Sequence, residues 1–115
     1  MQLKLIALSP KNSDDMDQLG DTYFLLNKVD QAIETYGAAI AIDPRNWNAL
    51  GNRGYAFEKQ GVVDAAIRDY GNALALNPRS VIYMRRGIVH QRKGNLEQAT
   101  RDLDAATIRW TPICT

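Results

Sequence analysis

The stretch that decides the fold is residues 47–80, WNALGNRGYAFEKQGVVDAAIRDYGNALALNPRS. Its apolar residues recur every three or four positions in two runs, which is the spacing of amphipathic helices. Gly61 separates the two runs, and Asn77 followed by Pro78 closes the second, because proline cannot continue a helix. The stretch therefore predicts two helices joined by a short turn.

The flanking sequence repeats this pattern. The four prolines of the chain stand 34 residues apart, at Pro10, Pro44, Pro78 and Pro112, and a fixed period of this length indicates a repeat array. We expect one all-α domain with repeat 1 at residues 13–46, repeat 2 at 47–80, and repeat 3 with a C-terminal tail at 81–115. Residues 1–12 are interpreted as either a partial repeat or an N-terminal capping helix.

Local signals place the helix ends. Ser13, followed by Asp14 and Asp15, predicts an N-cap with acidic residues in the first turn, where the helix dipole favours negative charge. In repeat 3, Gly87 lies 33 residues after Gly54, one fewer than the period. We therefore expect the turn before the third repeat to be one residue tighter.

Small residues recur at fixed positions and predict close helix crossings, because they let two helix axes approach each other. Glycines on the first helices are expected to face alanines on the second helices: Gly20, Gly54 and Gly87 against Ala32, Ala66 and Ala99. Gly37 and Gly71 are less expected, since each lies inside a second helix and costs about 0.5–1 kcal/mol relative to alanine. For these two glycines the sequence suggests only one explanation, which is another close contact.

Composition and charge are those of an ordinary soluble protein. Of the 115 residues, 45% are hydrophobic and 23% are charged, and the formal net charge is +1. Charge is graded along the chain: residues 1–46 carry four Lys/Arg against seven Asp/Glu, residues 47–80 four against three, and residues 81–115 six against three. A gradient of this kind would orient a partner along an elongated array.

Several function classes are disfavoured. The single cysteine, Cys114, excludes an internal disulfide, and no cysteine or histidine cluster has the spacing of metal ligands. No apolar run is long enough to span a membrane, and a cytoplasmic protein is the default expectation. No phosphate loop or nucleophile motif is present, so we expect no enzyme, no metal and no cofactor. His90 is interpreted as a packed histidine.

A basic cluster in the third repeat is a candidate phosphate-binding patch for nucleic acid. It contains Arg85, Arg86, Arg92 and Lys93. Only part of this cluster shares a helix face, and no stacking aromatic residues are interleaved with it. A nucleic-acid partner is therefore not expected.

The repeats resemble the tetratricopeptide repeat family. Its pattern has glycine at position 8, alanine at 20 and 27, an aromatic residue at 24 and proline at 32, and the match covers residues 13–112 with a partial unit before it. Position 8 is Gly20, Gly54 and Gly87, and position 24 is Tyr36, Tyr70 and Leu103, of which Leu103 is not aromatic. Arg53 and Arg86 depart from the usual leucine at position 7, and His90 departs from the usual aromatic residue at position 11.

The resemblance implies a right-handed superhelix of antiparallel helix pairs, whose first helices line a concave groove for a peptide or a partner's helix. Carried over by position, this peptide-binding groove contains Asp17 and Asp21 from repeat 1, Asn48, Asn52, Tyr55 and Lys59 from repeat 2, and Arg85, Ile88 and Arg92 from repeat 3. Asn52 is the strongest candidate, because an amide donates and accepts at once. Tyr55 would supply apolar contact, and Arg85 and Arg92 would meet acidic side chains.

Some members of the family bind the C-terminal carboxylate of a partner. They use a lysine and an asparagine from the first unit, an asparagine from the second, and a lysine and an arginine from the third. Only Asn52 and Arg85 match here, and Asp17 and Asp21 at the first-unit positions would repel the carboxylate of the ligand. A segment crossing the groove is therefore expected rather than a chain end.

Two functions are carried forward from the sequence. The first is a non-catalytic protein–protein interaction module that uses the groove. The second is a self-assembling scaffold unit, because a stacked array normally needs a terminal helix with a polar outer face. Leu103, Ile108 and Trp110 would otherwise be exposed, and homo-oligomers would form through the uncapped terminal helices.

Overall fold

The computed structural model describes the backbone of residues 12–110 and the side chains of residues 12–107. This part of the chain is all-α. Its helices are α2 (Ser13–Leu25), α3 (Val29–Ile42), α4 (Trp47–Gln60), α5 (Val63–Leu76), α6 (Ser80–Lys93) and α7 (Leu96–Trp110).

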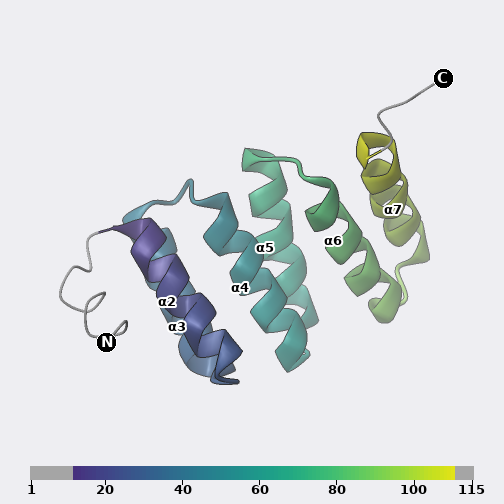
Figure 1. Cartoon of the computed structure of the whole chain (residues 1–115). Coiled ribbons are helices and arrows are strands. Elements are labelled where there is room, and N and C mark those ends of the chain that lie inside the picture. Colours follow the sequence, from purple (N-terminus) through teal and green to yellow (C-terminus); the bar gives the residue numbers. More distant parts are fainter. Residues whose placement is uncertain (1–11, 111–115) are drawn as a thin grey trace.

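The helices are arranged as three antiparallel pairs stacked side by side, from purple to yellow in Figure 1. Helices α2 and α3, α4 and α5, and α6 and α7 pack within the pairs, and the α3–α4 and α5–α6 contacts join neighbouring pairs. Along one side α2 contacts α4, and α4 contacts α6. The stack measures 49 × 31 × 21 Å, so it is elongated and leaves the first helix of every pair next to the same surface.

The start of the array differs from the expectation in one residue. Asn12, and not Ser13, caps α2, because the Asn12 side chain accepts hydrogen bonds from the backbone N–H groups of Asp14 and Asp15. The Ser13 hydroxyl instead donates to the Ala39 carbonyl, at 2.7 Å, and accepts from the Asn46 side chain, at 2.8 Å. Ser13 therefore ties the first helix pair to the turn that enters the second pair.

The turns follow the sequence pattern. Gly61 and Gly94 end α4 and α6 with φ angles of +82° and +92°, a left-handed conformation that glycine adopts without a steric cost. Asn27 takes the same region, with φ of +64°, after α2. Residues 77–79 connect α5 to α6, whereas residues 43–46 connect α3 to α4. The third repeat therefore enters through a turn that is one residue shorter, as the glycine spacing predicts.

Each pair is closed by a large side chain lying over a glycine. A β-carbon at Gly20 would come within 2.5 Å of the Tyr36 ring, and one at Gly54 within 2.9 Å of the Tyr70 ring. At Gly87 the nearest atom belongs to Leu103, at 3.0 Å. The nearest neighbours of these glycines are thus the residues at repeat position 24. The alanines expected to face the glycines are themselves buried, namely Ala32, Ala66 and Ala99.

Partly buried ion pairs replace leucine packing in the second and third repeats. Arg53 donates from Nε and Nη2 to the two carboxylate oxygens of Asp69, at 2.7 and 2.9 Å, and the Asp69 side chain is fully buried. Arg86 and Asp102 form the same pair at 2.8 Å for both bonds. The arginines that depart from the family pattern therefore each have a carboxylate partner on the second helix of their own repeat.

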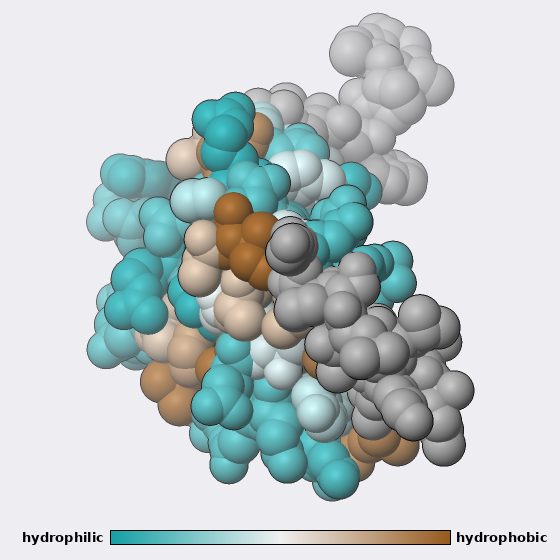
Figure 2. All heavy atoms as spheres, turned by 90° about the vertical axis from the view of Figure 1, so that its left-hand side faces the viewer, coloured by the Kyte–Doolittle hydropathy of each residue, from teal (hydrophilic) through white to brown (hydrophobic). Residues whose placement is uncertain are grey.

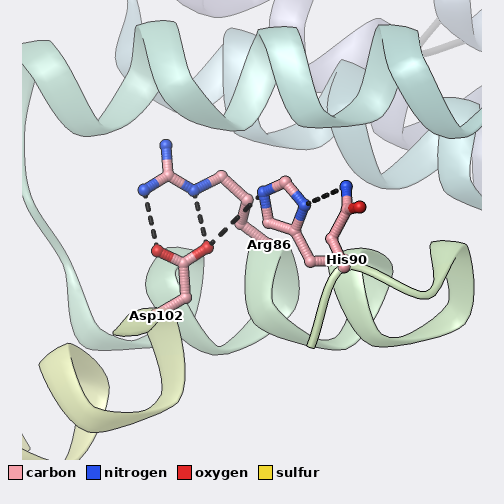
Figure 3. A network of polar contacts seen from close by, with 4 residues as sticks. Arg86, His90 and Asp102 are labelled. Atoms are coloured by element: carbon pink, nitrogen blue, oxygen red, sulfur yellow. Dashed lines mark hydrogen bonds and ion pairs between the residues drawn. The ribbon is translucent and has the colours of Figure 1, made fainter. Parts of the chain in front are cut away.

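His90 lies beside the third-repeat ion pair (Figure 3). Its Nε2 atom is 4.0 Å from Oδ2 of Asp102, and Nδ1 contacts the side-chain amide of Asn95 at 3.4 Å. The side chain is 12% exposed, as expected of a packed histidine. Burial lowers the pKa of His90; the Asp102 charge opposes this shift, and the charges of Arg86 and Lys93 add to it.

The surface at the α2 side of the stack is mostly hydrophilic, with apolar side chains confined to a few patches (Figure 2). Exposed large apolar residues on α2 and in the turn after it include Leu25 and Leu26, at 84% and 56%. Across the described helices, none is long and apolar enough to cross a membrane.

Candidate functional site

The candidate site is the surface carried by α2, α4 and α6, which we call the groove face. These helices lie next to one another because α2 contacts α4 and α4 contacts α6. All nine groove residues expected from the sequence lie on these three helices. Their side chains form three groups: an acid–amide cluster between α2 and α4, an aromatic hollow between α4 and α6, and an ion-pair chain near the C-terminal ends of α4 and α6.

The acid–amide cluster centres on Asp17. This carboxylate is only 4% exposed, and it accepts one hydrogen bond from the side-chain amide of Asn48, at 2.8 Å, and one from that of Asn52, at 3.0 Å. Asn48 and Asn52 lie one helical turn apart on α4, so a single carboxylate bridges both. The bond uses one N–H of Asn52, which leaves its carbonyl oxygen and second N–H for another partner.

The surroundings of Asp17 disfavour its charged form. Burial raises its pKa above the ordinary value of 3.8, the hydrogen bonds from Asn52 and Asn48 oppose that rise, and the charges of Asp21 and Asp14 add to it. From its repeat position, Asp17 is predicted to lie in the groove as a charge that repels a carboxylate. The structure gives it a second role, since it holds two amides in fixed positions.

Between α4 and α6 lies a hollow of about 230 Å³, which we call the aromatic hollow. Its walls come from α4, from α6 and the turn before it, and from one buried ring of α5. The lining residues are Trp47, Asn48, Gly51, Asn52, Tyr55, Tyr70, Arg79, Val81, Ile82 and Arg85. Four of the predicted groove residues, Asn48, Asn52, Tyr55 and Arg85, are therefore gathered around one cavity.

Two arginine guanidinium groups lie over aromatic rings that line this hollow. The Arg85 guanidinium lies 4.1 Å from the centre of the Tyr55 ring, and that of Arg79 lies 5.1 Å from the Trp47 ring. Within the described side chains, neither arginine forms an ion pair. Both remain available to an anionic group, while stacking holds them in place.

Tyr55 joins the three helices of the groove face. Its ring packs against the Phe24 ring of α2, with centres 5.4 Å apart, and the Lys59 ammonium lies 5.2 Å from its centre. Arg85 of α6 covers the same ring. The Tyr55 ring therefore contacts residues of all three helices and lies next to two cations.

The remaining predicted groove residues are partly engaged within the protein. Arg92 lies 3.4 Å from the Glu58 carboxylate, which also accepts the Tyr70 hydroxyl at 2.7 Å. Asp21 likewise accepts the hydroxyl of Tyr36. Arg92 is thus less available to a ligand than Arg85, although its side chain is 60% exposed. Ile88 is half-buried on α6.

Two residues of the hollow were not among the groove residues predicted from the sequence. Trp47 forms a wall of the hollow at the start of α4, and Arg79 lies in the turn before α6. Proximity between these two depends on how the second and third repeats stack, and no local motif reports that. Among the described residues, no group of three or more metal-ligating side chains gathers.

The residues predicted for self-association are placed only in part. Leu103 is half-buried and packs onto Gly87, so it belongs to the contact between α6 and α7 rather than to a fully exposed outer face. The side chains of Ile108 and Trp110 lie outside the described residues.

Comparison with protein families gives one match, in which residues 20–61 fit a model described as TPR repeat. A comparison with curated proteins finds no match.

Solved structures share this fold. The second TPR of Spaghetti (RPAP3), bound to the HSP90 peptide SRMEEVD, is 28% identical with a TM-score of 0.82, and the match covers 89% of this chain and 96% of that one. MamA is 22% identical with a TM-score of 0.88, and the match covers 92% of this chain and 63% of MamA. The Cut9–Hcn1 hetero-tetramer of APC/C is 23% identical with a TM-score of 0.89, over 95% of this chain and 21% of that one.

Proposed function

Because this chain is an array of tetratricopeptide repeats, we propose that it is a non-catalytic interaction module that binds an extended, acidic segment of another protein on the groove face. The observation that carries the proposal is the aromatic hollow with Arg79 and Arg85 standing on its rings. A hollow with apolar walls, amide groups and unpaired cations suits a chain segment with a carboxylate side chain.

Asn52 is the group that would hold the backbone of this segment. One of its N–H groups is already bonded to Asp17, at 3.0 Å, so the orientation of the amide is set before a ligand arrives. Preorganisation of this kind reduces the entropy lost on binding. The free carbonyl and the second N–H then pair with the N–H and C=O of an extended peptide.

The comparison with Spaghetti supports a peptide ligand. That domain, at 28% identity and nearly full coverage, is bound to the peptide SRMEEVD, which contains two glutamates and an aspartate. The first-repeat end of this chain carries Asp17 and Asp21, and their charges disfavour a free C-terminal carboxylate. We therefore propose that acidic side chains inside the segment, and not its terminus, are recognised.

The alternative, self-assembly through the ends of the array, is less well supported because the outer face of α7 is polar over the side chains that the structure describes, up to residue 107. In the first two repeats the second helix presents small or apolar residues to the following helix: Ile33, Gly37 and Ile40 in α3, and Ile67, Gly71 and Leu74 in α5. The same repeat positions in α7 are Thr100, Asp104 and Thr107, all exposed. A face of this kind suits solvent rather than another stacked helix.

The test uses SRMEEVD carrying an N-terminal fluorophore, with the C-terminus either free or amidated, and measures binding by fluorescence anisotropy. We expect the amidated peptide to bind at least as tightly as the free acid. Arg85→Ala should weaken binding about tenfold, or ~1.4 kcal/mol, and Asn52→Ala should also weaken it. Arg101→Ala is the matched control, since Arg101 is 67% exposed on α7 and, among the described residues, its ion pair is with Glu97 of the same helix.

Equal affinity of the Arg85→Ala and Arg101→Ala variants would overturn the proposed site. Loss of binding on amidation would show instead that the chain end is recognised.

A further inference from the structure

Gly51 is a glycine inside α4 with room for a side chain. At Gly54, on the same helix, a β-carbon would press into the Tyr70 ring, but one at Gly51 would have Cδ1 of Ile82 as its nearest neighbour across the interface, at the ordinary contact distance of 3.6 Å. A glycine inside a helix lowers helix stability. Gly51 also lines the aromatic hollow, so the missing side chain helps to leave that hollow open.

The interface between α2 and α4 shows what the same repeat position carries one repeat earlier. Asp17 precedes Gly51 by 34 residues, which is one period of the array. The buried carboxylate of Asp17 accepts hydrogen bonds from the side chains of Asn48 and Asn52 across the interface, at 2.8 and 3.0 Å. In this interface the protein itself therefore supplies a carboxylate to donors on the next first helix.

The interface between α4 and α6 has a donor at the matching place, and no acidic residue of the described chain lines its hollow. Repeat 3 follows repeat 2 by 33 residues, so Asn52 corresponds to Arg85 and Asn48 to Val81. Arg85 has no ion-pair partner among the described side chains. The hollow therefore combines an unpaired cation with open space beside Gly51, at the position that holds a carboxylate in the preceding interface.

We infer that a carboxylate of the bound segment lies beside Gly51, in the place that corresponds to the Asp17 carboxylate one repeat earlier, and that Gly51 determines the specificity for acidic segments. The inference rests on the proposed function, because it locates the acidic side chain of a segment bound on the groove face. Arginine and a carboxylate form a stronger hydrogen bond than arginine and an amide do. The site should therefore prefer an acid to its amide for as long as position 51 has no carboxylate of its own.

The experiment compares two fluorescent peptides with amidated C-termini. One is SRMEEVD, and in the other the three acidic residues are replaced by the corresponding amides. The measured quantity is the ratio of the two dissociation constants, obtained by fluorescence anisotropy. For the wild type we expect a ratio of about ten in favour of the acidic peptide.

Substitutions at Gly51 test where this preference arises. Gly51→Ala should keep most of the preference, because a methyl group fits at an ordinary contact distance. Gly51→Asp should bring the ratio close to one, because the introduced carboxylate takes the place of the carboxylate of the ligand and pairs with Arg85.

A charge control and a stability measurement show whether the effect is local. Gln91→Glu adds the same charge to α6 at an exposed residue that does not line the hollow, and salt screening should leave its ratio within about twofold of the wild type. Urea unfolding of Gly51→Asp is measured with and without Arg85→Ala. The introduced carboxylate should raise the urea midpoint more when Arg85 is present.

The outcomes separate the two proposals. If Gly51→Asp lowers the ratio no more than Gln91→Glu does, the inference is overturned and the proposed function stands. If Gly51→Asp changes the urea midpoint equally with and without Arg85, the introduced carboxylate does not meet that cation, and the inference is again overturned. If the wild type does not prefer the acidic peptide, the proposed function fails as well.

Discussion

Gly37 of α3 lies directly against the guanidinium group of Arg53 of α4: a β-carbon at Gly37 would sit 3.5 Å from Nη1 of that arginine. The same relationship recurs one repeat later, at 3.4 Å, between Gly71 and Arg86. Each arginine is thus enclosed between the glycine of the preceding repeat and the aspartate of its own repeat. Both distances are ordinary van der Waals contacts, so the arginines alone do not require glycine at these two helix positions, where glycine lowers helix stability.

The two kinds of helix glycine should respond differently to alanine. Gly37→Ala places a methyl group at ordinary contact distance from Arg53, so the gain in helix propensity should stabilise the protein by about 0.5–1 kcal/mol. Gly54→Ala pushes a methyl group to 2.9 Å from the Tyr70 ring and should destabilise by about 1–3 kcal/mol. Urea unfolding of both variants checks the pair. Shifts of the same sign would show that the two glycines do not differ in packing.

Replacing Arg53 and Asp69 together should cost less stability than replacing Arg53 alone. Arg53→Leu leaves a fully buried carboxylate without its partner and should cost about 3 kcal/mol. Adding Asp69→Thr restores the combination found at the same positions of repeat 1, where Leu19 and Thr35 are buried, and should recover most of the loss. The measurement is a double-mutant cycle by chemical denaturation. Additive losses from the two single variants would contradict this coupling.

Acidification should destabilise the fold through His90. Burial lowers its pKa below the ordinary value of 6.5, so the unfolded chain takes up a proton before the folded chain does. The stability contributed by neutral His90 is therefore complete above pH 6.5 and is lost as the pH falls towards the folded pKa. From about pH 7.5 to about pH 5.5, the free energy of unfolding of the wild type should fall relative to that of His90→Phe. Parallel pH profiles would rule out this contribution.

Asp17 should change the pH dependence of stability in the direction opposite to that of His90. Its pKa is raised above 3.8 in the folded state. As the pH falls, the folded chain therefore binds this proton at a higher pH than the unfolded chain does. Relative to Asp17→Asn, the wild type should gain stability as the pH falls from neutral to about pH 4, because protonation removes the cost of a buried charge. Carboxylates common to both proteins cancel in the comparison. A difference that is constant with pH would show that Asp17 titrates as an exposed acid does.

Sequence periodicity predicted the helix pairs well, because each pair depends on residues close together in the chain. The turn at Gly61 and the shorter entry to the third repeat were both predicted from the sequence pattern. Predictions were less accurate where a side chain has more than one possible hydrogen-bond partner. Ser13 was expected to cap α2, but its hydroxyl bonds to Ala39, which is 26 residues away.

The groove residues were predicted by position and not by contact. Asn52 and Tyr55 were assigned to a surface, but their present partners, Asp17 and Arg85, come from the repeats on either side. Leu103 was expected to be exposed at the end of the array, whereas it packs onto Gly87. These outcomes depend on how one repeat stacks on the next. Sequence spacing does not give the distances between side chains of different repeats.

By itself, the sequence determined the architecture, since the 34-residue ladder of prolines and the small residues at fixed positions leave stacked helix pairs as the way to bury the apolar stripes. Only the tertiary structure decided which departures from the pattern belong together. Glycine, arginine and aspartate from three helices form one packed unit. The physical reason is that helix periodicity sets which face a residue occupies, whereas partners across the stack are chosen by the packing of side chains distant in sequence.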